Sequence, residues 1–222
     1  MNKKIALIGG TGPEGRGLAK RLSITKNEIF IGSRDEIRGR EVAQELKNEL
    51  INNYPNINID GGDNIEMARL AEIVIIVVPY SAHKATLQQI KNVLADKIVI
   101  DAVVPMEFKK GPRSIDVEEG SATEEAAAIL VDSTVIGAFH NLSADTLLNL
   151  DKIVQGDVLI TGNDKDAKKI VGELSEEISS VRSVDAGPLR YSKYVELLTV
   201  LLIGINSRYK SHSSLSITDI NI

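Results

Sequence analysis

The sequence contains no cysteine and no tryptophan among its 222 residues, and aromatic residues make up only 4% of it. The absence of cysteine excludes disulfides, thiol catalysis and thiolate metal sites. Hydrophobic residues amount to 43%, so the core is expected to be aliphatic rather than aromatic. The net charge is −5 and no clustered basic face is evident, so the sequence does not predict nucleic-acid binding.

Long hydrophobic runs are also missing. The longest apolar segments, residues 73–79 and 197–205, are shorter than the roughly 18–20 residues that a membrane span requires. The first ten residues imitate a secretory signal, but the apolar run is too short and Gly-Thr-Gly-Pro follows it. We therefore expect a cytoplasmic protein that does not bind membranes.

Short apolar runs alternate with helix-like segments along the chain. We expect strands at residues 5–8, 28–31, 57–59, 73–78, 97–101, 134–139, 158–161 and 181–184. The runs are apolar on both faces, which is typical of a parallel sheet covered by helices on both sides. The sequence predicts an α/β protein: a doubly wound, mostly parallel sheet of the Rossmann type with a smaller C-terminal α/β extension.

The turn after the first expected strand is rich in glycine. Gly10-Thr11-Gly12-Pro13-Glu14-Gly15 has the pattern G-x-G-x-x-G, and it lies between a strand and a helix, which is the context this pattern requires. The first glycine permits the tight turn, the second lets a pyrophosphate approach the backbone, and the third lets helix and strand pack closely. The six residues are therefore candidates for dinucleotide binding. We expect the Glu14 side chain to point away from the phosphates.

The end of the second expected strand indicates which dinucleotide binds. An NAD site normally has an acidic residue about 20 residues after the glycines, but this chain has Ser33 and Arg34 there. Arg34 can pair with the 2′-phosphate of NADP, and Arg38 lies one helical turn further on. Thr11 is a further candidate contact. The alternative is that both arginines are merely solvated, but the pattern favours NADP over NAD.

The chain divides into two predicted parts. Residues 1–140 are assigned to an NADP-binding Rossmann domain and residues 141–222 to a smaller C-terminal domain. Residues 103–120 interrupt the alternation with two prolines, Gly111 and several basic residues, so we expect a surface loop there. Asp101 is expected to be a turn or cap residue. Glu196 lies within an apolar stretch, where a buried carboxylate needs a partner, and structural pairing is favoured over catalysis.

Several stretches together resemble one family. The segments IALIGGTGPEGRGLAKRL, EIFIGSR, VVPYSAH, GAFH and DAGPLRYSKYVELLT are similar to those of the NADP oxidoreductases that use the deazaflavin coenzyme F420. The similarity extends from about residue 4 to about residue 207. It implies an enzyme that transfers a hydride between C4 of the nicotinamide and C5 of the deazaflavin, with NADP(H) and F420 as its two ligands, and it implies a homodimer.

The resemblance also implies a second set of site residues, which line the place where the two rings stack. This set is Pro79, Tyr80, Val104, Pro105, His140, Asn141 and Leu142, to which we add the neighbouring Val78. His83 follows shortly after Pro79; contact with a cofactor and a plain surface role are equally favoured for it.

Direct hydride transfer between stacked rings needs proximity and orientation rather than a nucleophile, so no catalytic residue is required. His140 is a candidate orienting residue that hydrogen-bonds the deazaflavin or helps to move its N1 proton; the equally favoured alternative is that it caps a strand end. The three histidines lack metal-ligand spacing, no metal is expected, and His212 is expected to take no part. Two alternatives stay open: an NADPH-dependent reductase of another acceptor, such as a flavin, a ferric chelate or an imine, and a non-catalytic NADPH-binding sensor.

Overall fold

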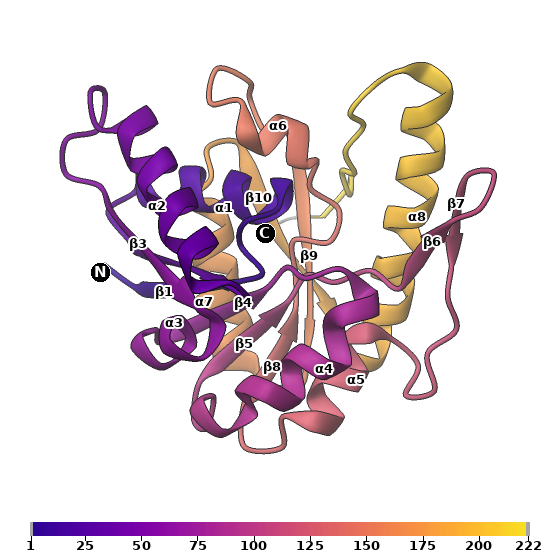
Figure 1. Ribbon diagram of the computed structural model, residues 1–222. Helices are drawn as coiled ribbons and strands as arrows, with labels where there is room; N and C mark the ends of the chain where they lie inside the picture. The colour runs from indigo at the N-terminus through magenta and orange to yellow at the C-terminus, as the bar shows by residue number, and fades with distance from the viewer. Residues whose placement is uncertain (1, 221–222) are drawn as a thin grey trace.

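The computed structural model describes residues 2–220, and its main feature is one eight-stranded sheet (Figure 1). The strand order is β10-β9-β8-β5-β4-β1-β2-β3. Neighbouring strands are parallel, apart from the antiparallel pair β8–β9. The strands of this sheet are β1 (Lys4–Ile8), β2 (Glu28–Ser33), β3 (Asn58–Asp63), β4 (Ile73–Ile76), β5 (Ile98–Asp101), β8 (Thr134–Gly137), β9 (Gly156–Gly162) and β10 (Val181–Gly187).

Helices connect these strands and cover both faces of the sheet. They are α1 (Pro13–Ser23), α2 (Glu36–Leu50), α3 (Asn64–Leu70), α4 (Tyr80–Ile90), α5 (Ala122–Ile129), α6 (Ala144–Leu148), α7 (Lys165–Glu176) and α8 (Ser192–Tyr209), with 3-10 turns at Lys91–Val93 and Leu189–Tyr191. This architecture confirms the predicted doubly wound, mostly parallel α/β fold with a C-terminal extension.

The alternation of side chains along β1 shows how the sheet divides the core. Ile5 and Leu7 belong to the cluster that packs under α1, α2, α6 and α7, whereas Ala6 and Ile8 belong to the cluster under α3, α4 and α5. Successive side chains of a strand point to opposite faces, so a strand that is apolar at every position is stable only when both faces are covered. All four side chains are fully buried.

The strand order reverses direction at β1, and this positions the site. From β1 the chain moves outward through β2 and β3, then returns to the other side of β1 with β4 and β5. In open α/β sheets, ligands bind beyond the carboxyl ends of the strands at such a reversal. The carboxyl ends of β1, β2, β4, β5 and β8 therefore frame the expected cleft.

Some local predictions differ from the structure. The expected loop at residues 103–120 contains a hairpin, β6 (Met106–Phe108) and β7 (Pro112–Ser114), which lies beside α8 in Figure 1. Strand β4 ends at Ile76, two residues earlier than expected, because Pro79 is the N-cap of α4 and the chain leaves the strand before it. Strands β9 and β10 extend the same sheet past residue 140, so the division into two domains stays a prediction.

Residues 2–220 contain neither a helix suited to a membrane nor a cluster of metal ligands. No helix there combines the length and apolar character needed to cross a membrane. No group of three or more acidic or histidine side chains in that range is arranged to hold a metal ion.

Candidate active site

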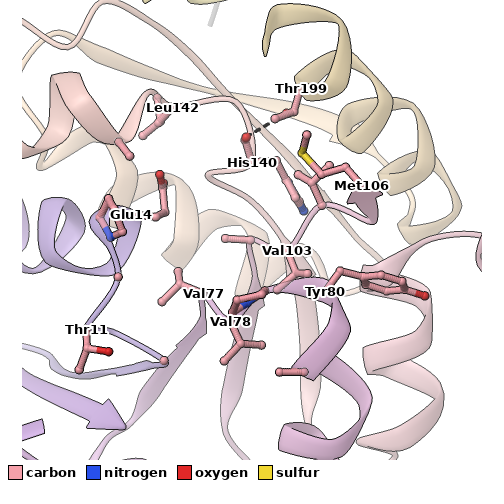
Figure 2. A pocket seen from close by; sticks show the side chains of 18 of the residues that line it. Thr11, Glu14, Val77, Val78, Tyr80, Val103, Met106, His140, Leu142 and Thr199 are labelled. Carbon is pink, nitrogen blue, oxygen red and sulfur yellow. Dashed lines mark hydrogen bonds between the residues drawn. The ribbon is translucent and has the colours of Figure 1, made fainter. Parts of the chain in front are cut away.

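A large cavity opens at the carboxyl ends of the central strands, between the glycine turn and α8 (Figure 2). Its volume of about 1650 Å³ exceeds the roughly 300–1,000 Å³ of a typical single-ligand pocket. Figure 2 shows Thr11 and Glu14 on one side of the cavity and Tyr80 and Met106 on the other. The cavity is therefore large enough to hold two ligands side by side.

The glycine turn has the geometry that the G-x-G-x-x-G pattern requires. A Cβ on Gly10 would lie 2.7 Å from the Leu7 carbonyl oxygen, and one on Gly15 would lie 2.5 Å from the Gly10 Cα. These two glycines thus serve the tight turn and the close packing of helix on strand. They do not line the cavity.

Gly12 is different, because a Cβ there would meet only the Gly9 carbonyl oxygen, at 4.0 Å. It lines the cavity and occupies the N-cap of α1, where no side chain accepts a hydrogen bond from the helix N-terminus. Pro13 follows as the first helical residue, where its lack of an N–H costs nothing. Open backbone at a helix N-terminus fits the diphosphate of a dinucleotide.

Ser33, Arg34 and Arg38 line the cavity next to the glycine turn. Asp35 lies between the two arginines in the sequence. It caps α2 by accepting hydrogen bonds from the amides of Ile37 and Arg38, at 2.9 and 3.2 Å. The carboxylate of Asp35 is thus directed at its own helix, and this leaves a hydroxyl and two guanidinium groups as the distinctive side chains at the end of β2.

The two arginines differ in their present partners. Arg38 Nη1 lies 3.2 Å from Glu41 Oε2 and 3.5 Å from Glu45 Oε1. Arg34 is exposed and makes no ion pair within residues 2–220. Arg34 can therefore bind a phosphate without breaking an existing pair, whereas Arg38 would have to be shared with two carboxylates.

Glu14 lines the cavity, although its side chain was expected to point away from the phosphates. Its Oε1 is shielded from solvent and has no hydrogen-bond partner among the described residues. Burial raises the pKa of this carboxyl to about 8. Glu14 is consequently neutral at pH 7 and does not repel an anion bound at the neighbouring helix N-terminus.

The half of the cavity away from the glycine turn is largely apolar. Of the residues predicted to line this half, the structure brings together Val78, Pro79, Tyr80, Val104, His140, Asn141 and Leu142. Pro105 lies outside this cavity and lines a smaller pocket beside it. Asn141 is buried and its Nδ2 donates a hydrogen bond to the Asp157 carbonyl oxygen at 2.7 Å, which fixes the turn after β8.

His140 is 5% exposed and contacts two helices, α8 and α5. Its main-chain oxygen accepts a hydrogen bond from Thr199 Oγ1 at 2.9 Å, drawn as a dashed line in Figure 2. Its ring Nε2 lies 3.5 Å from Thr123 Oγ1, and its Nδ1 has no partner among the described residues. Burial lowers its pKa to about 4, against an opposing effect of Asp101, so the ring is neutral at physiological pH.

His83 is fully buried and does not line the cavity, so the surface role that was one of its two alternatives is wrong. Its Nε2 lies 2.6 Å from Asp101 Oδ2 and its Nδ1 lies 2.8 Å from Glu125 Oε2. Burial lowers its pKa, but Asp101 and Glu125 more than compensate and hold it at about 9. The resulting imidazolium ties α4, β5 and α5 together, with the Tyr80 ring stacked at 6.0 Å.

Sequence reasoning missed a second wall of the cavity, which comes from the hairpin, α8 and the tail that follows it. Its residues include Met106, Thr199, Leu202, Ile203 and His212. His212, expected to take no part, also lies 3.4 Å from both Ser143 Oγ and Asp145 Oδ2. No local pattern marks these residues, because only the folded chain brings α8 and the tail to the carboxyl ends of the strands.

This arrangement suits a reaction that depends on placing two ligands against each other. One half of the cavity has open backbone and cationic side chains, and the other half has an apolar lining with a neutral imidazole. Proximity and orientation within such a site can supply about 7–11 kcal/mol of a reaction barrier. A nucleotide bound at the glycine turn therefore needs only a second ring in the apolar half to react with.

Comparisons with known proteins agree with this description. The family model described as "NADP oxidoreductase coenzyme F420-dependent" matches residues 4–105. The F420-dependent NADP reductase of Methanocaldococcus jannaschii is 38% identical over 99% of this chain and 100% of its own length. The reductase of the same name from Methanothermobacter marburgensis is 40% identical, covering 91% of this chain and 92% of its own.

A solved structure has the same fold over the whole chain. The putative F420-dependent NADP reductase from Arthrobacter sp. FB24 superposes with a TM-score of 0.81 and covers 99% of this chain and 100% of its own, at 22% identity. Together with the sequence matches, which extend over nearly the full length, the likeness confirms the resemblance found in the sequence. The chain belongs to the family of NADP oxidoreductases that depend on coenzyme F420.

Proposed function

We propose that this protein is an oxidoreductase that transfers a hydride between NADP(H) and the deazaflavin coenzyme F420. The observation that carries the proposal is full-length similarity, at 38–40% identity, to proteins named F420-dependent NADP reductase. The volume of the cavity and its division into a cationic and an apolar half support the same function. The two ligands supply the redox chemistry, and the protein holds them in place.

The NADP(H) half is assigned to the glycine turn and to the end of β2. The diphosphate lies on the open backbone at Gly12 and the N-terminus of α1. Ser33, Arg34 and Thr11 contact the 2′-phosphate, with Arg38 as an additional cation. A guanidinium pairs with a phosphate through two parallel hydrogen bonds, so Arg34 supplies the discrimination against NAD(H), which lacks that phosphate.

The deazaflavin half is assigned to the apolar lining. Pro79, Tyr80, Val104 and Leu142 bound the space for the ring, and His140 presents a buried polar side chain within it. A mostly apolar wall with few polar groups is typical of sites that orient a planar ligand. No side chain of the protein needs to form a covalent bond with either ligand, because the hydride passes directly from one ring to the other.

The test is to mix the purified protein with NADPH and oxidised F420 and to follow the visible absorbance of the deazaflavin. Bleaching at a rate proportional to protein concentration supports the proposal. A folded protein that binds NADPH but does not bleach F420 contradicts it. Screening flavins, ferric chelates and imines in the same NADPH-oxidation assay then identifies a reductase of another acceptor, and turnover with none of them indicates a non-catalytic NADPH sensor.

Two further predictions belong to this proposal: a homodimer and a cytoplasmic location. Tyr194, Leu197 and Leu201 on α8 and Phe108 on the β6–β7 hairpin are 40–72% exposed, which supports a second copy packing against this side of the molecule. Light scattering coupled to size-exclusion chromatography tests the dimer: about twice the monomer mass of 24.1 kDa is expected, and the monomer mass contradicts it.

A further inference from the structure

Glu196 lies between two cavities. It is 2% exposed and it lines a small pocket of about 140 Å³ on the side of α8 away from the main cavity. Asp116 and Lys193, both exposed, line the same small pocket, so this pocket communicates with solvent. Glu196 was expected to have a structural partner, and it has one: its carboxylate accepts hydrogen bonds from the amides of Ala122 and Thr123, each at 3.1 Å.

The side chain of Thr123 extends this contact toward the main cavity. Its Oγ1 lies 2.9 Å from Glu196 Oε1 and 3.5 Å from His140 Nε2. Thr123 is fully buried, and His140 lines the main cavity. Three side chains, from α8, α5 and the turn after β8, thus form one continuous line of hydrogen-bonding atoms between the small pocket and the main cavity.

The atoms of this line can be hydrogen-bonded in two directions. With the Glu196 carboxyl protonated, it donates to Thr123, Thr123 donates to His140 Nε2, and the proton of the imidazole lies on Nδ1. With Glu196 ionised, Thr123 donates to Glu196, His140 Nε2 donates to Thr123, and Nδ1 is free to accept. The two arrangements differ by one proton at the Glu196 end and by the tautomer of His140 at the cavity end.

We propose that Glu196, Thr123 and His140 form a proton relay that carries the ring proton accompanying hydride transfer between the main cavity and the small solvent-connected pocket. The inference rests on the proposed function. His140 lines the main cavity, and its buried Nδ1, which has no partner among the described residues, is the ring nitrogen left free to exchange a proton there. At the other end, the Glu196 carboxyl group exchanges protons with solvent through the small pocket.

The reaction balances with one proton. Reduction of the deazaflavin breaks the nicotinamide C4–H bond, passes its hydrogen and electron pair to the ring C5, and requires one proton at the ring N1. His140 Nδ1 gives up that proton, Nε2 takes the Thr123 hydroxyl proton, and Thr123 Oγ1 takes the Glu196 carboxyl proton. Glu196 is reprotonated through the small pocket, and in the opposite direction each proton moves the other way.

The ionisation of these groups suits the relay. Burial raises the pKa of Glu196 to about 8, with hydrogen bonds from Thr123 and Ala122 lowering it and Asp101 raising it. Asp101 on β5 and Tyr80 on α4 lie near Glu196 and His140. In the small pocket, Glu196 also shares the lining with two exposed charged residues, Asp116 and Lys193. Glu196 is therefore protonated at pH 7 and can act as the proton donor, while His140 stays neutral and can both donate and accept.

The test uses the protein without ligands. Nitrogen NMR of protein labelled in its three histidines reports which ring nitrogen of each carries the proton, and the His140→Asn variant assigns the His140 signal. The proton of His140 is expected on Nδ1 below about pH 8 and on Nε2 above it. A tautomer that does not change while Glu196 titrates overturns the proposal.

Variants of the middle residue separate a relay from a merely structural role. Thr123→Val should abolish the pH-linked tautomer change, and Thr123→Ser, which retains the hydroxyl, should restore it. Thr161→Val is the matched control, because Thr161 is a buried threonine that bonds Ser192 Oγ at 2.6 Å and lies outside the line. A tautomer change that persists in Thr123→Val overturns the relay.

Single-turnover reduction of F420 by NADPH adds a kinetic measurement. Thr123→Val should slow it by about 100-fold at pH 7, whereas Thr161→Val should change it less than about twofold. An unaltered rate in Thr123→Val, with the wild-type protein active, overturns the relay alone. A wild-type protein that does not reduce F420 instead overturns the proposed function, and the tautomer measurement then still decides whether the proton line exists.

Discussion

Nε2 of His83 lies 2.6 Å from Oδ2 of Asp101, and neither side chain reaches solvent. Glu125 binds the other ring nitrogen, so the imidazolium is enclosed between two carboxylates. These three side chains form a charged cluster. The other carboxylate oxygen of Asp101, Oδ1, accepts a hydrogen bond from the Val103 amide at 3.0 Å, and Val103 lines the cavity. The charged cluster therefore supports the floor of the site without entering it.

The cluster predicts a pH dependence of stability. The pKa of His83 is about 9 in the folded protein and about 6.5 when unfolded, so its contribution is complete below pH 6.5 and is lost as the pH rises through 9. His83→Gln should lower the unfolding free energy by about 3–5 kcal/mol at pH 6, and the difference from wild type should shrink toward pH 10. Urea denaturation from pH 6 to 10 measures this.

The control for His83→Gln is Gln88→Ala, which alters an exposed position on the same helix. It should change the unfolding free energy by less than about 0.5 kcal/mol and leave its pH dependence unaltered. A difference between wild type and His83→Gln that stays constant from pH 6 to 10 would show that the histidine is not charged in the folded protein.

Substitution of two glycines of the turn should affect two different properties: NADPH affinity at Gly12 and protein stability at Gly15. Gly12→Ala places a methyl group in open space where the diphosphate is expected, so NADPH affinity should fall by about tenfold or more while stability changes by less than about 0.5 kcal/mol. Gly15→Ala forces a Cβ against the Gly10 backbone and should lower the unfolding free energy by about 1–3 kcal/mol. NADPH titration and urea denaturation of both variants measure the pair. A stable Gly12→Ala protein with undiminished NADPH affinity would refute the placement of the diphosphate.

The end of β2 predicts how the protein chooses between NADPH and NADH. Arg34→Gln should weaken NADPH binding by about 10- to 100-fold, because it removes a charge-assisted contact to the 2′-phosphate, and should change NADH binding by less than about twofold. Arg40→Gln, a change of another exposed arginine on α2 that does not line the cavity, is the matched control. Isothermal titration with both nucleotides checks it, and equal losses for the two nucleotides would rule out this role for Arg34.

The tail after α8 is fastened at Asp157. This buried carboxylate accepts hydrogen bonds from Arg182 Nε at 2.8 Å and Nη2 at 2.7 Å, and from the Ile217 amide at 2.5 Å. Arg182 lowers the pKa of Asp157, so its ionised form is retained down to acidic pH and lost only as the pH falls below the ordinary range. The attachment holds the tail segment that includes His212 against the cavity.

Asp157→Asn should release this tail. Amide hydrogen exchange in residues 211–220 should become about tenfold faster, while exchange in β1 and β4 stays unaltered. Asp151→Asn, which changes an exposed carboxylate six residues earlier, is the control and should leave the tail protected. Unaltered exchange of the tail in Asp157→Asn would contradict this role.

The sequence predicted those parts of the molecule that depend on local patterns. Residues that are apolar at every position along short runs predicted the parallel sheet, and the six residues from Gly10 to Gly15 predicted the turn at the end of β1. The cluster of His83, Asp101 and Glu125 could not be predicted, because its members are 18 to 42 residues apart and only the packing of α4 and α5 on β5 brings them together. The wall that α8 and the tail add to the cavity could not be predicted either, because only the folded chain brings these distant segments to the carboxyl ends of the strands.

Transfer of isotope measures the central claim most directly. NADPH carrying deuterium at C4 of the nicotinamide is mixed with the protein and oxidised F420, and the reduced deazaflavin is analysed by mass spectrometry. Direct hydride transfer predicts that deuterium from one face of the nicotinamide appears in the deazaflavin product and that none is lost to water. Reduced deazaflavin that carries only solvent hydrogen, from either labelled face, would contradict the account.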